Sequence, residues 1–216
     1  MKLGADELRE RFAVFGRFYR ADFGGQPLAL RSHLEIFERG MPWPQAVAAR
    51  ADLVAVMMNP GGSRPLEELD SAGWAPTLPD RTQYQLMKLA LLAQAAGQAI
   101  RHIRVINLSD LRTPKSAELF AHLATLGDEG HSLFSACRQS ELHTALGSTN
   151  PSPLLRAWGL ARQLDPLARK AVAATDHCRV LGLTDNGLSY RHPLPQRADF
   201  QQRWLDGMAQ QMAATL

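Results

Sequence analysis

The sequence predicts an α/β fold: a three-layer α/β/α arrangement around a central, mainly parallel four-stranded sheet. Four short apolar runs have the length and composition of strands buried on both faces. They lie at 53–58, 102–106, 154–159 and 179–183. Helical patterns separate the runs, as expected for parallel strands joined by crossovers. Ligands of open α/β sheets bind at the carboxyl ends of strands, so the polar turns that follow these runs form the candidate site.

The chain is predicted to be a single domain, with a helical and edge-strand extension over 1–50 and the α/β core over 51–216. In the extension, four apolar residues at helical spacing predict a helix over 5–20, and a strand is expected over 28–37. The residues at helical spacing are Leu8, Phe12, Phe15 and Tyr19.

The helices of the core follow from capping and periodicity. Asp80 is the expected N-cap of a helix that runs to about residue 96. The long, proline-rich stretch before it, over 61–79, has the length of a functional or mobile loop. Further helices are predicted over 116–126, 131–146, 160–175 and 199–212.

Composition narrows the class of protein. Apolar residues make up 45% and charged residues 21% of the 216 positions, as in soluble globular proteins. The balance of 24 basic to 21 acidic residues is too mild to indicate nucleic acid by itself. Cys137 and Cys178 are the only cysteines, which argues against a disulfide framework. No apolar stretch is long enough for a membrane span and no signal peptide is recognised, so a cytoplasmic location is expected.

Two asparagines end the first two core strands. Asn59 is followed by Pro60, Gly61 and Gly62, whose backbone permits close approach of a ligand and can form an anion nest. Asn107 offers both a donor and an acceptor, which suits the polar edge of a nucleobase. Both motifs are also compatible with ordinary turns.

A late histidine completes the set. His192 precedes Pro193, and the restricted backbone would hold its imidazole in place to donate to a developing negative charge. No metal or cofactor is predicted. His131, Cys137 and His143 are spaced by six and do not share one helix face, and glycine-rich nucleotide motifs do not occur.

In this order, the signatures resemble the bacterial family called domain of unknown function 1643. The resemblance covers roughly residues 53–205, and one departure is Gly61-Gly62, where that family usually has a serine after the proline. The matching positions are Asn59-Pro60, Asp80 with Thr82, Asn107-Leu108 with Arg112, Trp158-Gly159, and His192-Pro193-Leu194.

More remotely, the same order is similar to the uracil-DNA glycosylase superfamily. That resemblance implies that Asn59 positions a water for attack at the sugar carbon and that Asn107 reads the amide edge of the base. It also implies that His192 stabilises charge on the departing base and that Leu194 wedges into the duplex. Arg112, Asp80 and Thr82 would line or brace the pocket.

Three hypotheses follow. The chain hydrolyses an N-glycosidic bond of a nucleobase, or it is a non-catalytic module that binds a nucleotide or nucleic acid, or the motifs serve turns alone. The predicted partners are a nucleobase, a nucleotide or DNA; the oligomeric state is left open. The first two hypotheses require that Asn59, Asn107 and His192 converge on one pocket.

Overall fold

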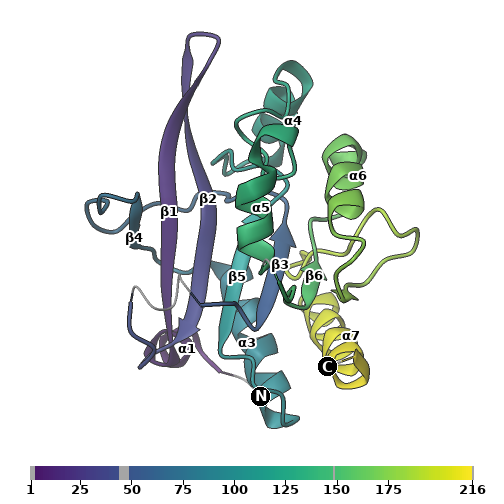
Figure 1. Ribbon diagram of the computed structural model, residues 1–216. Helices are drawn as coiled ribbons and strands as arrows, with labels where there is room; N and C mark the ends of the chain where they lie inside the picture. Colours follow the sequence, from purple (N-terminus) through teal and green to yellow (C-terminus); the bar gives the residue numbers. More distant parts are fainter. Residues whose placement is uncertain (1–2, 44–48, 148, 216) are drawn as a thin grey trace.

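A computed structural model describes residues 3–43, 49–147 and 149–215 (Figure 1). Its sheet is larger than the predicted one, with seven strands in the order β4-β1-β2-β5-β3-β6-β7. The four predicted strands form its parallel half: β3 (Leu53–Met57), β5 (His102–Asn107), β6 (Leu154–Arg156) and β7 (Val180–Leu181). The antiparallel half consists of β1 (Phe12–Phe23), β2 (Gln26–Glu38) and β4 (Trp74–Pro76). The prediction of a four-stranded sheet was therefore wrong.

The N-terminal region accounts for the difference. The predicted helix over 5–20 stops early: α1 covers only Ala5–Arg11, and β1 follows directly. Burial alternates along the start of β1, where Phe12, Val14 and Phe18 are buried, and this period of two overrides the helical spacing. Pairing with β2 along the whole strand forms a long hairpin (Figure 1). Residues 1–2 and 44–48 of the predicted extension lie outside the described residues.

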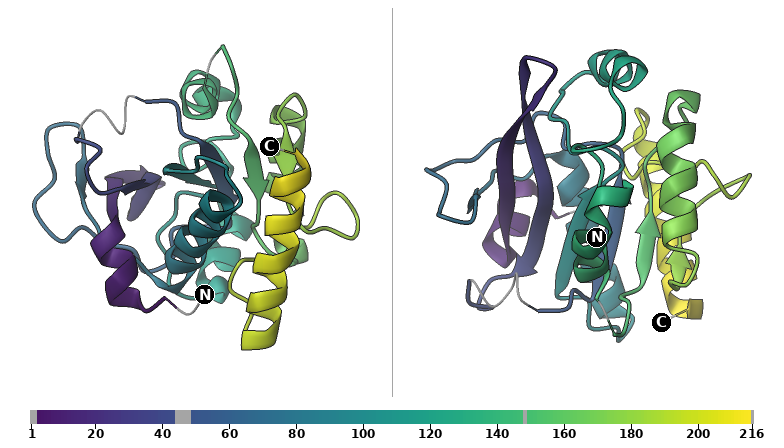
Figure 2. Two further views of the ribbon diagram at one scale, coloured as in Figure 1. Left: turned by 90° about the horizontal axis from the view of Figure 1, so that it is seen from below. Right: turned by 45° about the horizontal axis from the view of Figure 1, so that its top comes forward.

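Helices cover both faces of the sheet, as predicted (Figure 2). Side chains of β3 alternate between two cores, with Leu53, Ala55 and Met57 in one and Val54 and Val56 in the other. The first core is covered by α1, α3 (Arg81–Ala95) and α7 (Ala198–Thr215). The second is covered by α4 (Ser116–Thr125), α5 (Gln139–Leu146) and α6 (Asp165–Ala174). In the part of the chain that the structure describes, no helix combines the length and apolarity needed to cross a membrane.

Most predicted helices lie close to their expected positions, with two exceptions in length. The helix expected over 131–146 begins only at 139, after a 3-10 turn, η1 (Ala136–Arg138). Similarly, η2 (Arg162–Leu164) occupies the start of the helix expected over 160–175.

A β-bulge in the hairpin determines which way one charged side chain points. Arg17 pairs with His33 and Phe18 pairs with Arg31, so Ser32 is an extra residue in β2. The extra residue reverses the alternation of β2. Leu34 therefore packs in the core beneath α3 whereas Leu30 packs in the opposite core. Without the bulge, Arg31 would share the face of His33; with it, Arg31 lies on the α3 side.

Candidate functional site

A cavity of about 170 Å³ opens at the carboxyl ends of β3 and β5, beside the start of α3. An apolar cavity of about 150 Å³ can hold a benzene molecule, so a cavity of this size has room for an aromatic ring. It is lined by seven of the predicted residues: Asn59, Pro60, Gly61, Asp80, Thr82, Asn107 and His192. The three residues expected to converge, Asn59, Asn107 and His192, thus line one cavity. Arg31 and Thr113, which are not among the predicted site residues, also line it.

Three predicted residues lie outside this lining. Arg112 donates through Nε to the Ser63 carbonyl, and its guanidinium carbon lies 5.2 Å from the centre of the Phe18 ring. It therefore braces the loop that follows the Asn59 turn. Leu194 contributes its backbone N–H to His192, and Gly62 is exposed.

Asn59 is fixed through its amide nitrogen. Nδ2 donates to the carbonyls of Leu111 and Thr113, at 3.2 and 2.9 Å, and lies 2.9 Å from Thr113 Oγ1. These contacts orient the amide, and no described residue donates to Oδ1. A rigid carbonyl oxygen at a pocket wall can accept a hydrogen bond from a water molecule or from a ligand N–H.

The pocket floor contains two polar side chains without protein partners. Asn107, the last residue of β5, has an exposed fraction of 0%, and no described residue forms a hydrogen bond with either of its amide atoms. Arg31 is 2% exposed, and its guanidinium likewise has no hydrogen-bond partner among the described residues. Burial lowers the pKa of Arg31 to about 10, so the group remains charged at neutral pH.

His192 and Asp80 complete the wall. Nδ1 of His192 accepts the Leu194 N–H at 3.1 Å, which places the proton of the neutral ring on Nε2. Burial lowers the pKa of this histidine, which favours the neutral form. Asp80 is the predicted N-cap of α3: its Oδ1 accepts the Gln83 N–H, and its own N–H donates to the Gln83 side chain. The capping box holds the carboxylate at the pocket rim.

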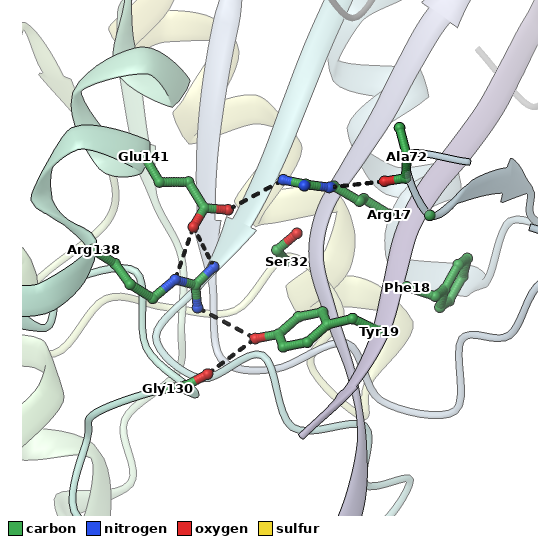
Figure 3. A pocket seen from close by; sticks show the side chains of 9 residues that line it. Arg17, Phe18, Tyr19, Ser32, Ala72, Gly130, Arg138 and Glu141 are labelled. Atoms are coloured by element: carbon green, nitrogen blue, oxygen red, sulfur yellow. Dashed lines mark hydrogen bonds and ion pairs between the residues drawn. The ribbon is translucent and has the colours of Figure 1, made fainter. Parts of the chain in front are cut away.

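A second polar cluster lies on the opposite side of the hairpin, around a cavity of about 360 Å³ (Figure 3). We call it the ion-pair network; it consists of Arg17, Tyr19, Asp110, Arg138 and Glu141. Arg138 bridges the two carboxylates, with Nη1 2.6 Å from Asp110 and Nη2 2.9 Å from Glu141. The Tyr19 hydroxyl donates to Asp110 at 2.8 Å, and Arg17 lies 3.6 Å from Glu141. Its charges are paired internally, which is typical of a structural cluster.

Neither metal ligation nor similarity supplies a function. Within the ranges that the structure describes, no group of three or more histidine, cysteine or acidic residues could hold a metal ion. Comparison of the chain with protein-family models, with curated proteins and with solved structures finds no significant match. The family resemblance of the sequence stays a prediction.

Proposed function

We propose that this pocket binds a nucleobase and that the chain hydrolyses the N-glycosidic bond that joins the base to its sugar, on a uracil-DNA glycosylase-like fold. The observation that carries the proposal is the Asn107 amide: it is fully buried and has no protein partner among the described residues, and Asn107 lines the cavity. A buried amide without hydrogen bonds is costly unless a ligand supplies them. The edge of a nucleobase offers a neighbouring donor and acceptor, which match the two amide atoms.

The other residues of the pocket support a reaction that needs no protein nucleophile. The C1′–N bond breaks with its electron pair on the base, and the oxygen of a water molecule bonds to C1′. Asn59 Oδ1 would accept a hydrogen bond from that water, and His192 Nε2–H would donate to the departing base. The second proton of the water passes to solvent, and the departing base takes up a proton from solvent when it leaves the pocket, so atoms and charges balance.

One observation favours the alternative, a non-catalytic module that binds a nucleotide or nucleic acid. An amide such as Asn59 can orient water but is a poor proton acceptor. Among the described residues, the single carboxylate at the pocket is that of Asp80, which is already engaged in capping α3. Binding without cleavage would therefore support this second function.

A base-excision assay tests the proposal. Labelled duplex and single-stranded oligonucleotides that carry uracil, hypoxanthine or mismatched thymine are incubated with the protein, and abasic sites are detected by strand cleavage. We expect cleavage by the wild type and a loss of at least about 100-fold in Asn59→Ala and His192→Ala. Asn150→Ala, at an exposed asparagine remote from the pocket, is the matched control.

The absence of cleavage on every substrate would reject hydrolysis. Calorimetric titration with free uracil and hypoxanthine then decides the alternative. Binding that is lost in Asn107→Ala would establish a nucleobase-binding module, and no binding of either base would reject both functions.

A further inference from the structure

We propose that Arg31 is the anion-binding group of the pocket and that the nucleobase is held there in its deprotonated form. This inference rests on the proposed function. The bulge at Ser32 places Arg31 on the α3 side of the sheet, where it lines the cavity together with Asn107, and the Arg31 backbone N–H donates to the Asp110 carbonyl at 2.9 Å. Gly16 leaves space for the Phe18 ring and for the Arg31 side chain, because a Cβ there would lie 2.8 Å from the ring and 3.2 Å from Arg31 Cδ.

The charge of Arg31 is not balanced by an ion pair. No carboxylate oxygen of the described residues lies within 4.0 Å of its guanidinium. The charged or titratable groups that face it are Asp80 and Asp110, whose charges favour its protonated form, and Arg112, which opposes it; His192 lies across the same pocket. A buried guanidinium with unfilled donors calls for a ligand that brings negative charge and several acceptors.

The neighbouring Asn107 restricts which anion fits. A carboxylate or a phosphodiester would use the donors of Arg31 but, having no donor of its own, would leave the amide acceptor of Asn107 unpaired. An oxo-substituted base that has lost a ring proton satisfies both: its carbonyl oxygen and ring nitrogen accept from Arg31, and a second edge pairs with Asn107. The ligand class is therefore an oxo-pyrimidine or oxo-purine with an acidic ring N–H.

The same contact assists bond cleavage. When the C1′–N bond breaks, the electron pair stays on the base and its charge spreads over the ring nitrogen and carbonyl oxygens. Arg31 is positioned to donate to that developing anion in a site with little water, where a fixed charge acts most strongly. Arg31 would thus supply full charge stabilisation, whereas the neutral His192 supplies a hydrogen bond.

Calorimetric titration with free bases at about pH 7, 8 and 9 tests the inference. In this range Arg31, with a pKa of about 10, stays largely charged, Asp110, with a pKa of about 6, is ionised, and His192 is neutral, so the ligand is the main titrating group. The probes are uracil, hypoxanthine and 5-fluorouracil, a more acidic analogue of uracil with nearly the same shape. For the wild type we expect affinity to rise by up to about tenfold per pH unit and to favour 5-fluorouracil over uracil.

In Arg31→Met, both the pH dependence and the preference for 5-fluorouracil should disappear, while Arg31→Lys retains part of each. Arg101→Met, at an exposed arginine far from the cavity, is the control and should behave as the wild type. Thermal unfolding checks the fold: because the guanidinium has no protein partner, Arg31→Met should melt no lower than the wild type.

Any other outcome contradicts the inference, and each one identifies which assumption is wrong. If bases bind to the wild type without pH dependence, or equally well to Arg31→Met, the anion contact is wrong and the proposed function stands. If Arg31→Met unfolds, Arg31 is a structural residue. If no base binds to the wild type, the proposed function fails together with the inference.

Discussion

Arg31 and Arg138 are both largely buried arginines near the N-terminal hairpin, and they differ in what surrounds them. Arg138 contacts two carboxylates and the Tyr19 hydroxyl, and these partners raise its pKa although burial opposes them. The Arg31 guanidinium has no hydrogen-bond partner among the described residues, and burial lowers its pKa. An arginine side chain is thus paired with carboxylates in the ion-pair network, whereas the arginine side chain of the pocket has no partner in the described part of the chain.

The difference separates a structural cluster from a candidate binding site. A buried charge that is already paired holds the elements around it together, and a ligand could replace its partners only at a cost. A buried charge without partners lowers the stability of the folded state. Its presence in a protein therefore indicates a functional role rather than a structural one. The comparison therefore predicts opposite effects for one substitution at the two positions.

The largest effect is expected for Arg138→Met. Loss of Arg138 leaves the Asp110 carboxylate, which is 0% exposed, without its ion-pair partner. Breaking a buried pair on one side costs about 3–5 kcal/mol. Urea unfolding at neutral pH should show a drop of this size in the free energy of unfolding. A change of a few tenths of a kcal/mol would mean that the network is not a stabilising cluster.

The next effect is a dependence on pH through His33, which lies across the bulge from Arg31. Burial and the charges of Arg104, Arg17, Arg138 and Arg31 lower its pKa from 6.5 to about 3. These effects outweigh Glu141, whose Oε1 is 3.8 Å from Nδ1, so the ring is neutral in the folded state.

Because the unfolded chain binds the proton more tightly, His33 lowers stability as pH falls from about 6.5 toward 3. Each pKa unit corresponds to about 1.4 kcal/mol, so the loss can reach a few kcal/mol. The difference in the free energy of unfolding between the wild type and His33→Gln should change most steeply with pH in this range. A constant difference between pH 4 and 7 would contradict the assignment of a buried neutral ring.

A smaller effect, of opposite sign to that of Arg138→Met, is expected for Arg31→Met. The methionine is apolar and similar in length, and it removes a charge that lacks partners. Replacement of a buried ion pair by apolar residues of similar volume can stabilise a protein by about 1–4 kcal/mol, and for this single unpaired charge we expect the lower part of that range. Urea unfolding of the two methionine variants side by side provides the measurement. Equal destabilisation by both would remove the distinction between the two regions.

The smallest effect on stability is expected for Asp80→Asn. Asparagine caps a helix about as well as aspartate, so the free energy of unfolding should change by less than about 0.5 kcal/mol, whereas Asp80→Ala should cost about 1 kcal/mol. Removal of the negative charge from the pocket rim should nevertheless strengthen the binding of a base anion. Calorimetry with 5-fluorouracil tests this. Weaker binding to Asp80→Asn would indicate that Asp80 contacts the base directly.

The parallel half of the sheet and most of the pocket could be predicted from the sequence. Strands buried on both faces are continuous apolar runs, and Asn59, Asn107 and His192 follow such runs or their loops, where the fold brings strand ends together. The cap at Asp80 also has a local cause, since Gln83 three residues later completes the capping box.

The hairpin could not be predicted as easily from the sequence. Arg31, which lies in it, was therefore not predicted as a pocket residue. Phe12, Phe15 and Tyr19 fit a helical period, and only pairing with β2 makes the period of two decisive. Arg31 is a charged residue within a mostly buried strand, which is a signal that it shares with Glu35. Its direction, however, depends on Ser32, and an extra residue is recognised only from the register of the partner strand.

Because of the bulge, the pocket also depends on the number of residues in β2, which amino-acid composition does not reveal. Deletion of Ser32 alone would leave every charged and apolar residue of β2 in the chain, yet it would carry Arg31 to the side of the ion-pair network. The length of this strand, rather than its residue types, would then distinguish chains that hold a cation in the pocket from chains that do not. Among related sequences, a gap of one residue at this position is therefore a marker for the loss of the anion-binding property.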